Sequence, residues 1–487
     1  MQIYGDSRMK KMCAIISLCL ILGTQATVKA DETSQLMKKT AGVAKRSLVR
    51  IECPIKIGEA TRTIVATGIC IDSSGIFMAL GIDTALDPKD VDEKNLKAYL
   101  PGNNPKSFKT SLMGIDPMTG LTFFKVNGGS FKAITFMSAA KVTIGDKLLS
   151  AGLTLTDPAS PVTVGVAYAS CINNGVYKRI EVTGGTLGPV GSVVLNSKGN
   201  AIGLVGKQPL KLYRTITGRG GLAPLHLKAE ENTTSFIPAE EFAYILSAIP
   251  RNKSKVRMKW VGIGKFSPLP AEDAKTLGIN KPAVRIEQVI PGYSAARAGL
   301  RNGDIVVGYN GKDLQKFTSP ELIAQALAKK IIRSQFRSIN LTVRDSDGST
   351  REVQLHIQSM PKLPTEAKSI VNARIGLVAR EKVKLDQYLN PGPTAKSKGL
   401  LVIQVGKNSP AEIAGLLRGD LIVGINGSPV ATAKKAQEIM NRIMTADNPD
   451  DLTLSIKRGK SNIINIVIKA SKFKLKNAKK GADNAKG

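Results

Sequence analysis

Histidine, tryptophan and acidic residues are scarce in this chain of 487 residues, and each shortage argues against a class of function. The only two histidines, His226 and His356, lie far apart in the sequence, which argues against a histidine metal site and leaves few imidazole bases for catalysis. Trp260 is the only tryptophan and aromatic residues make up 5% of the chain, so an aromatic platform for stacking nucleic-acid bases is not expected.

Acidic residues are outnumbered by basic ones, 38 against 70, which gives a formal net charge of +32. A charge of this size favours anionic partners such as lipid headgroups or acidic polymers. No basic motif with interleaved aromatic residues is present, so we expect no specific nucleic-acid partner. Two interpretations of the charge stay open: a solvated surface, or binding to an anionic surface through the basic segment Lys207–Arg219.

The five cysteines do not form a metal-binding pattern, and we expect neither a metal nor another cofactor. Two of them lie in the N-terminal apolar segment, which leaves Cys53, Cys70 and Cys171, an odd number for an oxidising compartment. Cys53 and Cys70 lie on what read as successive strands. The sequence leaves open whether they form a disulfide or stay as buried thiols.

Apolar stretches long enough to cross a bilayer are missing throughout the sequence. The N-terminus instead has two lysines, a shorter apolar run from Met12 to Gly23 and a small-x-small sequence ending at Ala30. This pattern predicts a signal peptide over residues 1–30, cleaved after Ala30, and export to the periplasm or another extracytoplasmic compartment. Met1 and Met9 both qualify as the start of translation.

From about residue 47 to residue 245, short apolar strands alternate with turns rich in glycine, asparagine and aspartate, which predicts a barrel or a sandwich. The stretch Gly184–Gly203 combines a glycine-rich turn, an apolar strand, a Ser-Lys-Gly turn and a second strand. It resembles the nucleophile hairpin of the HtrA/Deg-type trypsin-like serine proteases. The segments 66–82 and 114–126 resemble the parts of the same proteases that carry the histidine and the aspartate.

This resemblance assigns the catalytic histidine, aspartate and serine positions to Ile82, Gly120 and Val190. None of these side chains can act as a base or a nucleophile. We therefore expect the chain to be a pseudoprotease and not an enzyme, with no catalytic residues. The alternative is a divergent serine endopeptidase with residual activity, in which Ser192, two residues after the expected position, replaces the nucleophile.

Two internal repeats, residues 289–311 and 405–427, share the pattern Ala-x-x-Ala-Gly-Leu-x-x-Gly-Asp followed by Asn-Gly. Self-similarity on this scale indicates a duplicated domain. The pattern resembles PDZ domains, in which the small residues let a short helix pack on the sheet. Asn310-Gly311 and Asn426-Gly427 are expected to be hairpin turns with positive φ.

A candidate peptide-binding loop precedes each repeat. In such loops successive backbone N–H groups face the terminal carboxylate of a peptide, which adds as a strand to the neighbouring sheet edge. Helices starting near Pro320 and Ala433 are expected to form the other wall of each groove; a closed groove is the alternative. The expected site residues are Val261, Gly262 and Ile263 in the first copy, and Ile375, Gly376 and Leu377 in the second.

Together these motifs predict a mainly β protein in which a trypsin-like double β-barrel precedes two PDZ domains, each a small β-barrel with helices. The expected boundaries are 31–250 for the barrel domain, 258–358 and 372–470 for the PDZ domains, and 471–487 for a basic disordered tail. The predicted function is binding of protein C-termini or unfolded peptides, as an adaptor, scaffold or chaperone in protein quality control. The resemblance also implies assembly into trimers or larger homo-oligomers.

Overall fold

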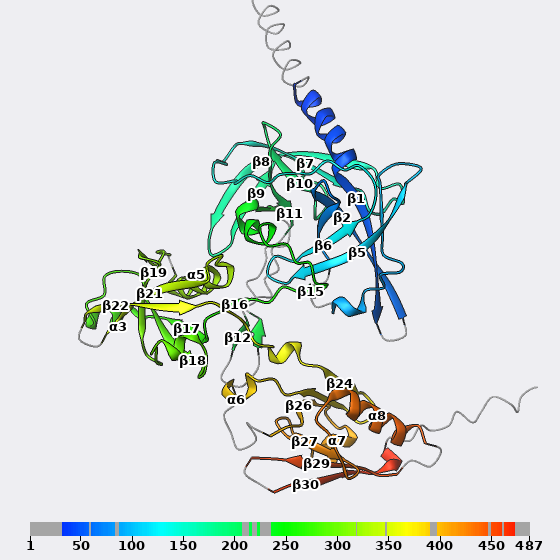
Figure 1. Ribbon diagram of the computed structural model, residues 1–487, viewed down its shortest axis with the longest axis vertical. Coiled ribbons are helices and arrows are strands. Elements are labelled where there is room, and N and C mark those ends of the chain that lie inside the picture. The colour runs from blue at the N-terminus through cyan, green and yellow to red at the C-terminus, as the bar shows by residue number, and fades with distance from the viewer. Residues whose placement is uncertain are drawn as a thin grey trace, which may run out of the picture. The chain divides into compact units, whose positions relative to one another are not determined.

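The computed structural model describes residues 32–472 apart from 58–59, 83–86, 207–213, 217–221, 225–234, 318, 346–347, 390–396, 447–449 and 460–461 (Figure 1). The chain divides into two compact units, residues 1–215 with 224–358, and residues 216–223 with 359–487. In the part described, no helix has the length and apolar character needed to cross a membrane. The predicted signal peptide, all but the first two residues of the predicted C-terminal tail, His226 and most of the basic segment Lys207–Arg219 lie outside the described residues.

A helix over residues 32–47 leads into the first of two closed barrels. The strand order of that barrel is β5-β4-β1-β2-β3-β6, and pairing between β5 and β6 closes it. Its phenylalanine-rich core includes Phe77 and Phe131, whose rings meet edge to face at 4.9 Å. The strands are β1 (Leu48–Ile57), β2 (Ala60–Asp72), β3 (Ile76–Leu80), β4 (Lys97–Tyr99), β5 (Ser107–Asp116) and β6 (Leu121–Val126), with the 3-10 turn η1 (Pro88–Asp90) before β4.

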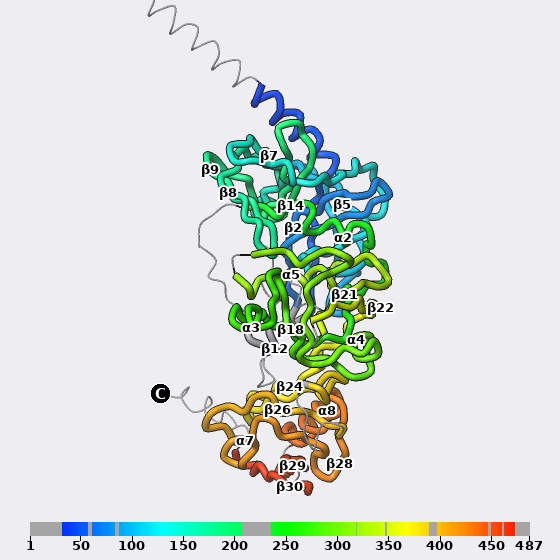
Figure 2. Tube along the Cα trace, turned by 90° about the vertical axis from the view of Figure 1, so that its left-hand side faces the viewer, coloured from blue at the N-terminus to red at the C-terminus, as the bar shows by residue number. Residues whose placement is uncertain are grey.

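The second barrel has the order β10-β11-β14-β9-β8-β7, and Figure 2 shows β7, β8 and β9 side by side. Its strands are β7 (Lys147–Leu153), β8 (Val162–Asn174), β9 (Lys178–Thr183), β10 (Val193–Asn196), β11 (Ala201–Val205) and β14 (Ser235–Pro238). A small separate sheet is formed by β12 (Arg214–Ile216) and β13 (Leu222–Pro224). An apolar cluster with residues from both barrels, including Phe123 and Val193, joins them. The predicted trypsin-like double barrel is therefore confirmed.

The segment after the second barrel returns to the first one. It contains η3 (Ala239–Glu241), α2 (Ala243–Leu246) and β15 (Ser254–Lys255), and β15 pairs in parallel with β5. The Tyr244 hydroxyl donates a hydrogen bond of 2.6 Å to the fully buried carboxylate of Asp116, at the end of β5. The same carboxylate accepts hydrogen bonds from Met118 N and Thr119 Oγ1. Asp116 thus fixes both the turn that follows it and the helix that ends the barrel domain.

The first PDZ domain is a sheet of order β17-β18-β19-β21-β22 with the helix α5 lying against β17. Its strands are β16 (Lys259–Trp260), β17 (Ile263–Pro268), β18 (Val284–Val289), β19 (Ile305–Tyr309), β20 (Lys312–Asp313), β21 (Ser338–Arg344), β22 (Thr350–His356) and β23 (Gln358–Ser359). Its helices are α3 (Ala271–Thr276), α4 (Ser294–Arg297) and α5 (Pro320–Arg333). The apolar face of α5, including Ile323 and Leu327, packs into the core.

The second PDZ domain has the order β24-β25-β26-β27-β29-β30. Its strands are β24 (Ser369–Asn372), β25 (Leu377–Glu381), β26 (Leu400–Val405), β27 (Leu421–Ile425), β28 (Ser428–Pro429), β29 (Leu452–Lys457) and β30 (Ile464–Ile468). Its helices are α6 (Asp386–Leu389), α7 (Pro410–Ile413) and α8 (Ala433–Met444), with 3-10 turns η4 (Pro364–Glu366) and η5 (Ala470–Lys472). β24 begins at Ser369, three residues before the start at residue 372 that we expected for this domain.

The predicted hairpin turns of both repeats are confirmed by their backbone angles. Asn310 and Gly311 have φ of 50° and 71°, and Asn426 and Gly427 have φ of 42° and 76°. Two successive positive φ values match the right-handed twist of the flanking strands, and this is why Asn-Gly is preferred there.

The three cysteines beyond the predicted signal peptide are free thiols, two of them buried. Burial raises the pKa of both Cys53 and Cys70 to about 11, so little reactive thiolate forms near neutral pH. We expect iodoacetamide at pH 8 to alkylate the exposed Cys171 alone in the folded protein, and all three thiols in urea. Mass spectrometry of tryptic peptides measures this; failure of Cys53 and Cys70 to react in urea without reductant would reveal a disulfide.

Candidate active-site hairpin and peptide-binding grooves

The three residues at the catalytic positions of the resemblance have different surroundings. Ile82 follows β3 and is buried in the core of the first barrel. Gly120 ends the turn after Asp116, has a φ of 77°, and donates its N–H to the Asp116 carbonyl at 3.0 Å. Val190 is 56% exposed. Packing in the barrel core fixes Ile82, and the turn after Asp116 fixes Gly120.

Ser192, the alternative nucleophile, is fully buried where β10 begins. Its Oγ donates a hydrogen bond of 2.7 Å to the Pro189 carbonyl, and the Ser192 N–H donates to the same carbonyl at 3.1 Å. The site is tightly packed, because a Cβ at Gly152 would lie 1.9 Å from this Oγ. Among the residues that the structure describes, the single histidine is His356 at the end of β22, in the first PDZ domain.

The first predicted peptide-binding loop, Val261 to Ile263, is fixed by its carbonyl groups. The Val261 carbonyl accepts a hydrogen bond from Ala295 N, and the Gly262 carbonyl accepts one from Ile290 N, both at 2.8 Å. The C=O and N–H of a trans peptide unit point in opposite directions. The N–H groups of Gly262 and Ile263 therefore point away from these partners. Two neighbouring donors with the same orientation are suited to a carboxylate.

Gly262 is required for this loop. Its φ is 92°, and a Cβ at this position would lie 2.3 Å from the Cβ of Tyr293. Any other residue would meet both a strained backbone and a steric clash. The loop continues directly into β17, which pairs only with β18 among the described strands and so forms the edge of its sheet.

The second predicted loop, Ile375 to Leu377, repeats this arrangement. The Ile375 carbonyl accepts from Ala411 N at 3.0 Å, and the Gly376 carbonyl accepts from Gly406 N at 2.7 Å. Gly376 has a φ of 71°, and a Cβ there would lie 2.2 Å from the Cβ of Ser409. The sheet edge next to this loop differs, because β25 pairs with β26 on one side and with β24 on the other.

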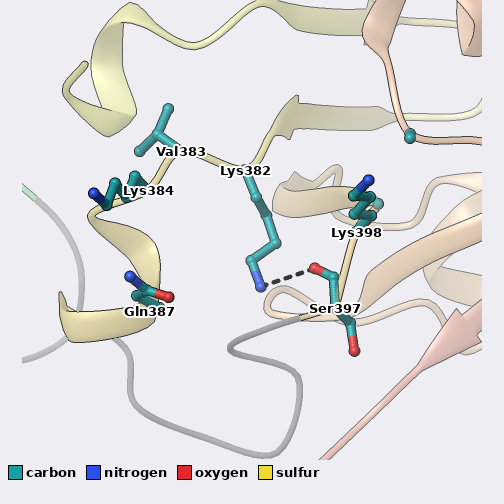
Figure 3. A pocket seen from close by; sticks show the side chains of 8 residues that line it. Lys382, Val383, Lys384, Gln387, Ser397 and Lys398 are labelled. Carbon is teal, nitrogen blue, oxygen red and sulfur yellow. Dashed lines mark hydrogen bonds between the residues drawn. The ribbon is translucent and has the colours of Figure 1, made fainter. Parts of the chain in front are cut away.

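A basic cavity of about 270 Å³ lies at the far end of β25, and sequence reasoning did not identify it. Three lysines line it, Lys382, Lys384 and Lys398, and Lys382 Nζ donates a hydrogen bond of 3.2 Å to the Ser397 carbonyl (Figure 3). Partial burial and the neighbouring Arg380 lower the pKa of Lys382, which Asp386 only partly offsets. The three lysines give the cavity a basic lining.

A second feature missed by sequence reasoning is a buried ion-pair cluster around Glu241 in the first unit. The Glu241 carboxylate, 4% exposed as a residue, accepts hydrogen bonds from Lys329 Nζ at 2.8 Å and from Arg333 Nη1 at 2.7 Å. Both basic residues belong to α5, and both also lie over the ring of Tyr177. Burial alone would raise the pKa of Glu241, but Lys329 and Arg333 outweigh it and hold that pKa below its ordinary value.

Comparison with known proteins first defines the class of the C-terminal part. Residues 285–333 and 401–458 match the PDZ domain family. Both matched ranges contain a predicted repeat, and they also include the helices α5 and α8.

Several known proteins are similar to this chain over most of its length. The chain is 24% identical over 369 residues to the "Probable periplasmic serine endoprotease DegP-like" of Chlamydia trachomatis, covering 74% of this chain and 68% of that protein. It is 24% identical over 417 residues to the "Periplasmic serine endoprotease DegP" of Salmonella typhimurium, covering 80% and 76%. The solved HtrA-type protease AlgW with a decapeptide is 15% identical over 67% of this chain and 99% of that chain, with a TM-score of 0.46.

These relatives confirm the predicted resemblance to HtrA/DegP-like serine proteases with PDZ domains, and the predicted periplasmic location. They also correct one prediction. The chain was expected not to be an enzyme because Ile82, Gly120 and Val190 occupy the catalytic positions, but these relatives are named as serine endoproteases. The catalytic positions inferred from three short motifs do not decide the class of the whole chain.

Proposed function

We propose that this HtrA-like chain binds peptides or protein C-termini through its PDZ domains, as an adaptor, scaffold or chaperone in periplasmic protein quality control. The observation that carries the proposal is the pair of neighbouring N–H groups at Gly262 and Ile263, which point away from the partners of the Val261 and Gly262 carbonyls and lie next to the edge strand β17 and the helix α5. A peptide pairing with β17 would place its terminal carboxylate at these donors. The domain boundaries 258–358 and 372–470 belong to the same proposal, as does assembly into a homo-oligomer.

Replacing Gly262 with aspartate tests this proposal. We expect the best-binding decapeptide from an array of free C-termini to lose at least about tenfold in affinity for the full chain, because the loop cannot keep its φ and a carboxylate repels the ligand. Fluorescence polarisation measures the affinity. Gly278→Asn is the matched control, since Gly278 also has a positive φ but open space around it.

The same peptide with an amidated C-terminus provides a control that does not depend on protein folding. We expect it to bind much more weakly than the free acid, because an amide carries no charge for the two N–H groups to stabilise. Equal affinities of the acid and the amide, together with an unaffected Gly262→Asp variant, would contradict binding at this loop.

A second candidate function is binding of an anionic group in the cavity of Lys382, Lys384 and Lys398, supported by the positive lining of that cavity. Affinity for a polyanion such as heparin should then fall steeply between 50 and 200 mM salt and should fall again in the Lys398→Glu variant. Salt-independent binding, or no effect of the substitution, would contradict this candidate.

A further inference from the structure

The strand β24 runs along the edge of β25 in the second PDZ domain. The two strands are antiparallel, with Ser369 opposite Arg380 and Asn372 opposite Leu377. The contact extends one residue upstream, where Glu381 N donates to the Lys368 carbonyl at 2.8 Å. β24 therefore runs towards the loop at Gly376, which is the direction of a bound peptide whose C-terminus reaches such a loop.

The side chains of β24 alternate between the domain interior and solvent. Ile370 and Asn372 are buried, at 2% and 7% exposure, whereas Val371 is 66% exposed. Ile370 belongs to the apolar core of this domain. The Asn372 amide lies against the helix α8, with Nδ2 3.2 Å from Met444 Sδ and 3.9 Å from Met440 Sδ.

α8 packs against both β24 and β25, and Figures 1 and 2 both place β24 next to α8. β24 thus contacts the strand and the helix that form the two walls of a PDZ groove. In the first PDZ domain, β17 is the strand that corresponds to β25. It lies against α5, and among the described strands it has a partner on one side only. The carbonyl contacts of the two loops are the same, so the occupied sheet edge is what distinguishes the domains.

We propose that β24 is a built-in ligand of the second PDZ groove, which leaves the first PDZ domain as the site for external peptides. This inference rests on the proposed function, because it assumes peptide binding by strand addition. β24 is joined to β25 by a turn of four residues, Ala373 to Gly376, and such a short connection gives an effective concentration on the order of millimolar or higher. A free peptide competes poorly against a segment tethered in this way.

The residues of β24 indicate which peptide side chains the second groove accepts. Ile370 and Asn372 are the two inward residues, so the groove takes a β-branched apolar side chain two positions before a small polar one. A suitable probe is a decapeptide that copies residues 363–372, Leu-Pro-Thr-Glu-Ala-Lys-Ser-Ile-Val-Asn, with a free C-terminal carboxylate.

Hydrogen exchange of the full wild-type chain tests the proposal without any substitution. We expect amides of 369–372 and 377–381 to exchange slowly in the peptide-free protein and to stay unchanged when the probe is added. Rapid exchange in these segments, or slowing of 377–381 by the probe, would overturn the inference. Slowing of 263–268 by array-selected peptides reports separately on the proposed function. Its absence contradicts peptide binding by the first PDZ domain but not the occupation of the second groove by β24.

The substitution Ile370→Asp should open the groove, because a buried carboxylate prevents β24 from taking its place. We expect the full-length variant to bind the probe about tenfold or more tightly than wild type, as the tethered competitor is removed. Val371→Asp is the matched control on the exposed face of the same strand, and it should bind like wild type. Equal probe binding by all three proteins overturns the inference; if Ile370→Asp does not fold, the exchange experiment decides.

Discussion

Replacing Asp386 with alanine is expected to destabilise the second PDZ domain by about 3–5 kcal/mol, the usual cost of breaking a buried ion pair from one side. Two hydrogen bonds join Arg380 and Asp386, Nη2 to Oδ1 at 2.6 Å and Nη1 to Oδ2 at 2.8 Å. The side chains are 8% and 2% exposed. Without Asp386 the guanidinium stays buried and loses this counter-charge, and the Val383 N–H loses its acceptor.

Hydrogen exchange of the β25 amides under native conditions measures this loss within the intact chain. Asp451→Ala is the control, because Asp451 pairs with Lys469 at 2.8 Å with side chains 38% and 69% exposed. Exposed pairs contribute less than about 1 kcal/mol. Similar losses for the two substitutions would show that burial does not set the strength of these ion pairs.

Replacing Glu241 with glutamine is expected to destabilise the contact between η3 and α5 by about 3 kcal/mol. The substitution keeps the size of the side chain but leaves two buried cations, Lys329 and Arg333, without their counter-charge. Their side chains are only 17% and 11% exposed, so water compensates little. The fluorescence of Trp260, the only tryptophan of the chain, follows unfolding of this region in urea.

The pH dependence of this contact follows from the lowered pKa of Glu241. The pKa of glutamate in an unfolded chain is about 4.3. A carboxylate with a lower pKa in the folded state contributes its full stabilisation above the unfolded pKa. This contribution is lost as the pH falls through the folded pKa. The stability difference between wild type and Glu241→Gln should be constant from pH 6 to 8 and shrink below about pH 4. Glu240→Gln is the control, because Glu240 makes its ion pair with Lys178 and accepts no hydrogen bond from Lys329 or Arg333. A difference that does not change with pH would contradict the role of the Glu241 charge.

The features that the sequence predicted correctly are local in sequence or repeated in it. Asn-Gly at two equivalent positions predicts hairpin turns because only a few residue types accept positive φ. The alternation of short apolar strands with turns predicts the barrels, because each strand presents one face to a core.

The features that were missed depend on partners far away in the sequence. Glu241 meets Lys329 and Arg333 across about ninety residues, and each of the three reads as an ordinary surface charge. β24 is only four residues long and follows the segment 361–368, which contains two prolines and two lysines and is typical of a linker. β24 is a strand because it pairs with the edge of β25. The sequence does not show that this edge is open to a partner.

The contacts of Asp116 have a consequence for synthesis and export. The first barrel contains β1 to β6, yet the Asp116 carboxylate accepts one of its hydrogen bonds from Tyr244, and β5 also pairs with β15. At translation rates of about 5–20 residues per second, residues 244–255 emerge roughly 6–28 s after residue 116. The N-terminal barrel therefore lacks these two contacts until a segment made after the second barrel has emerged.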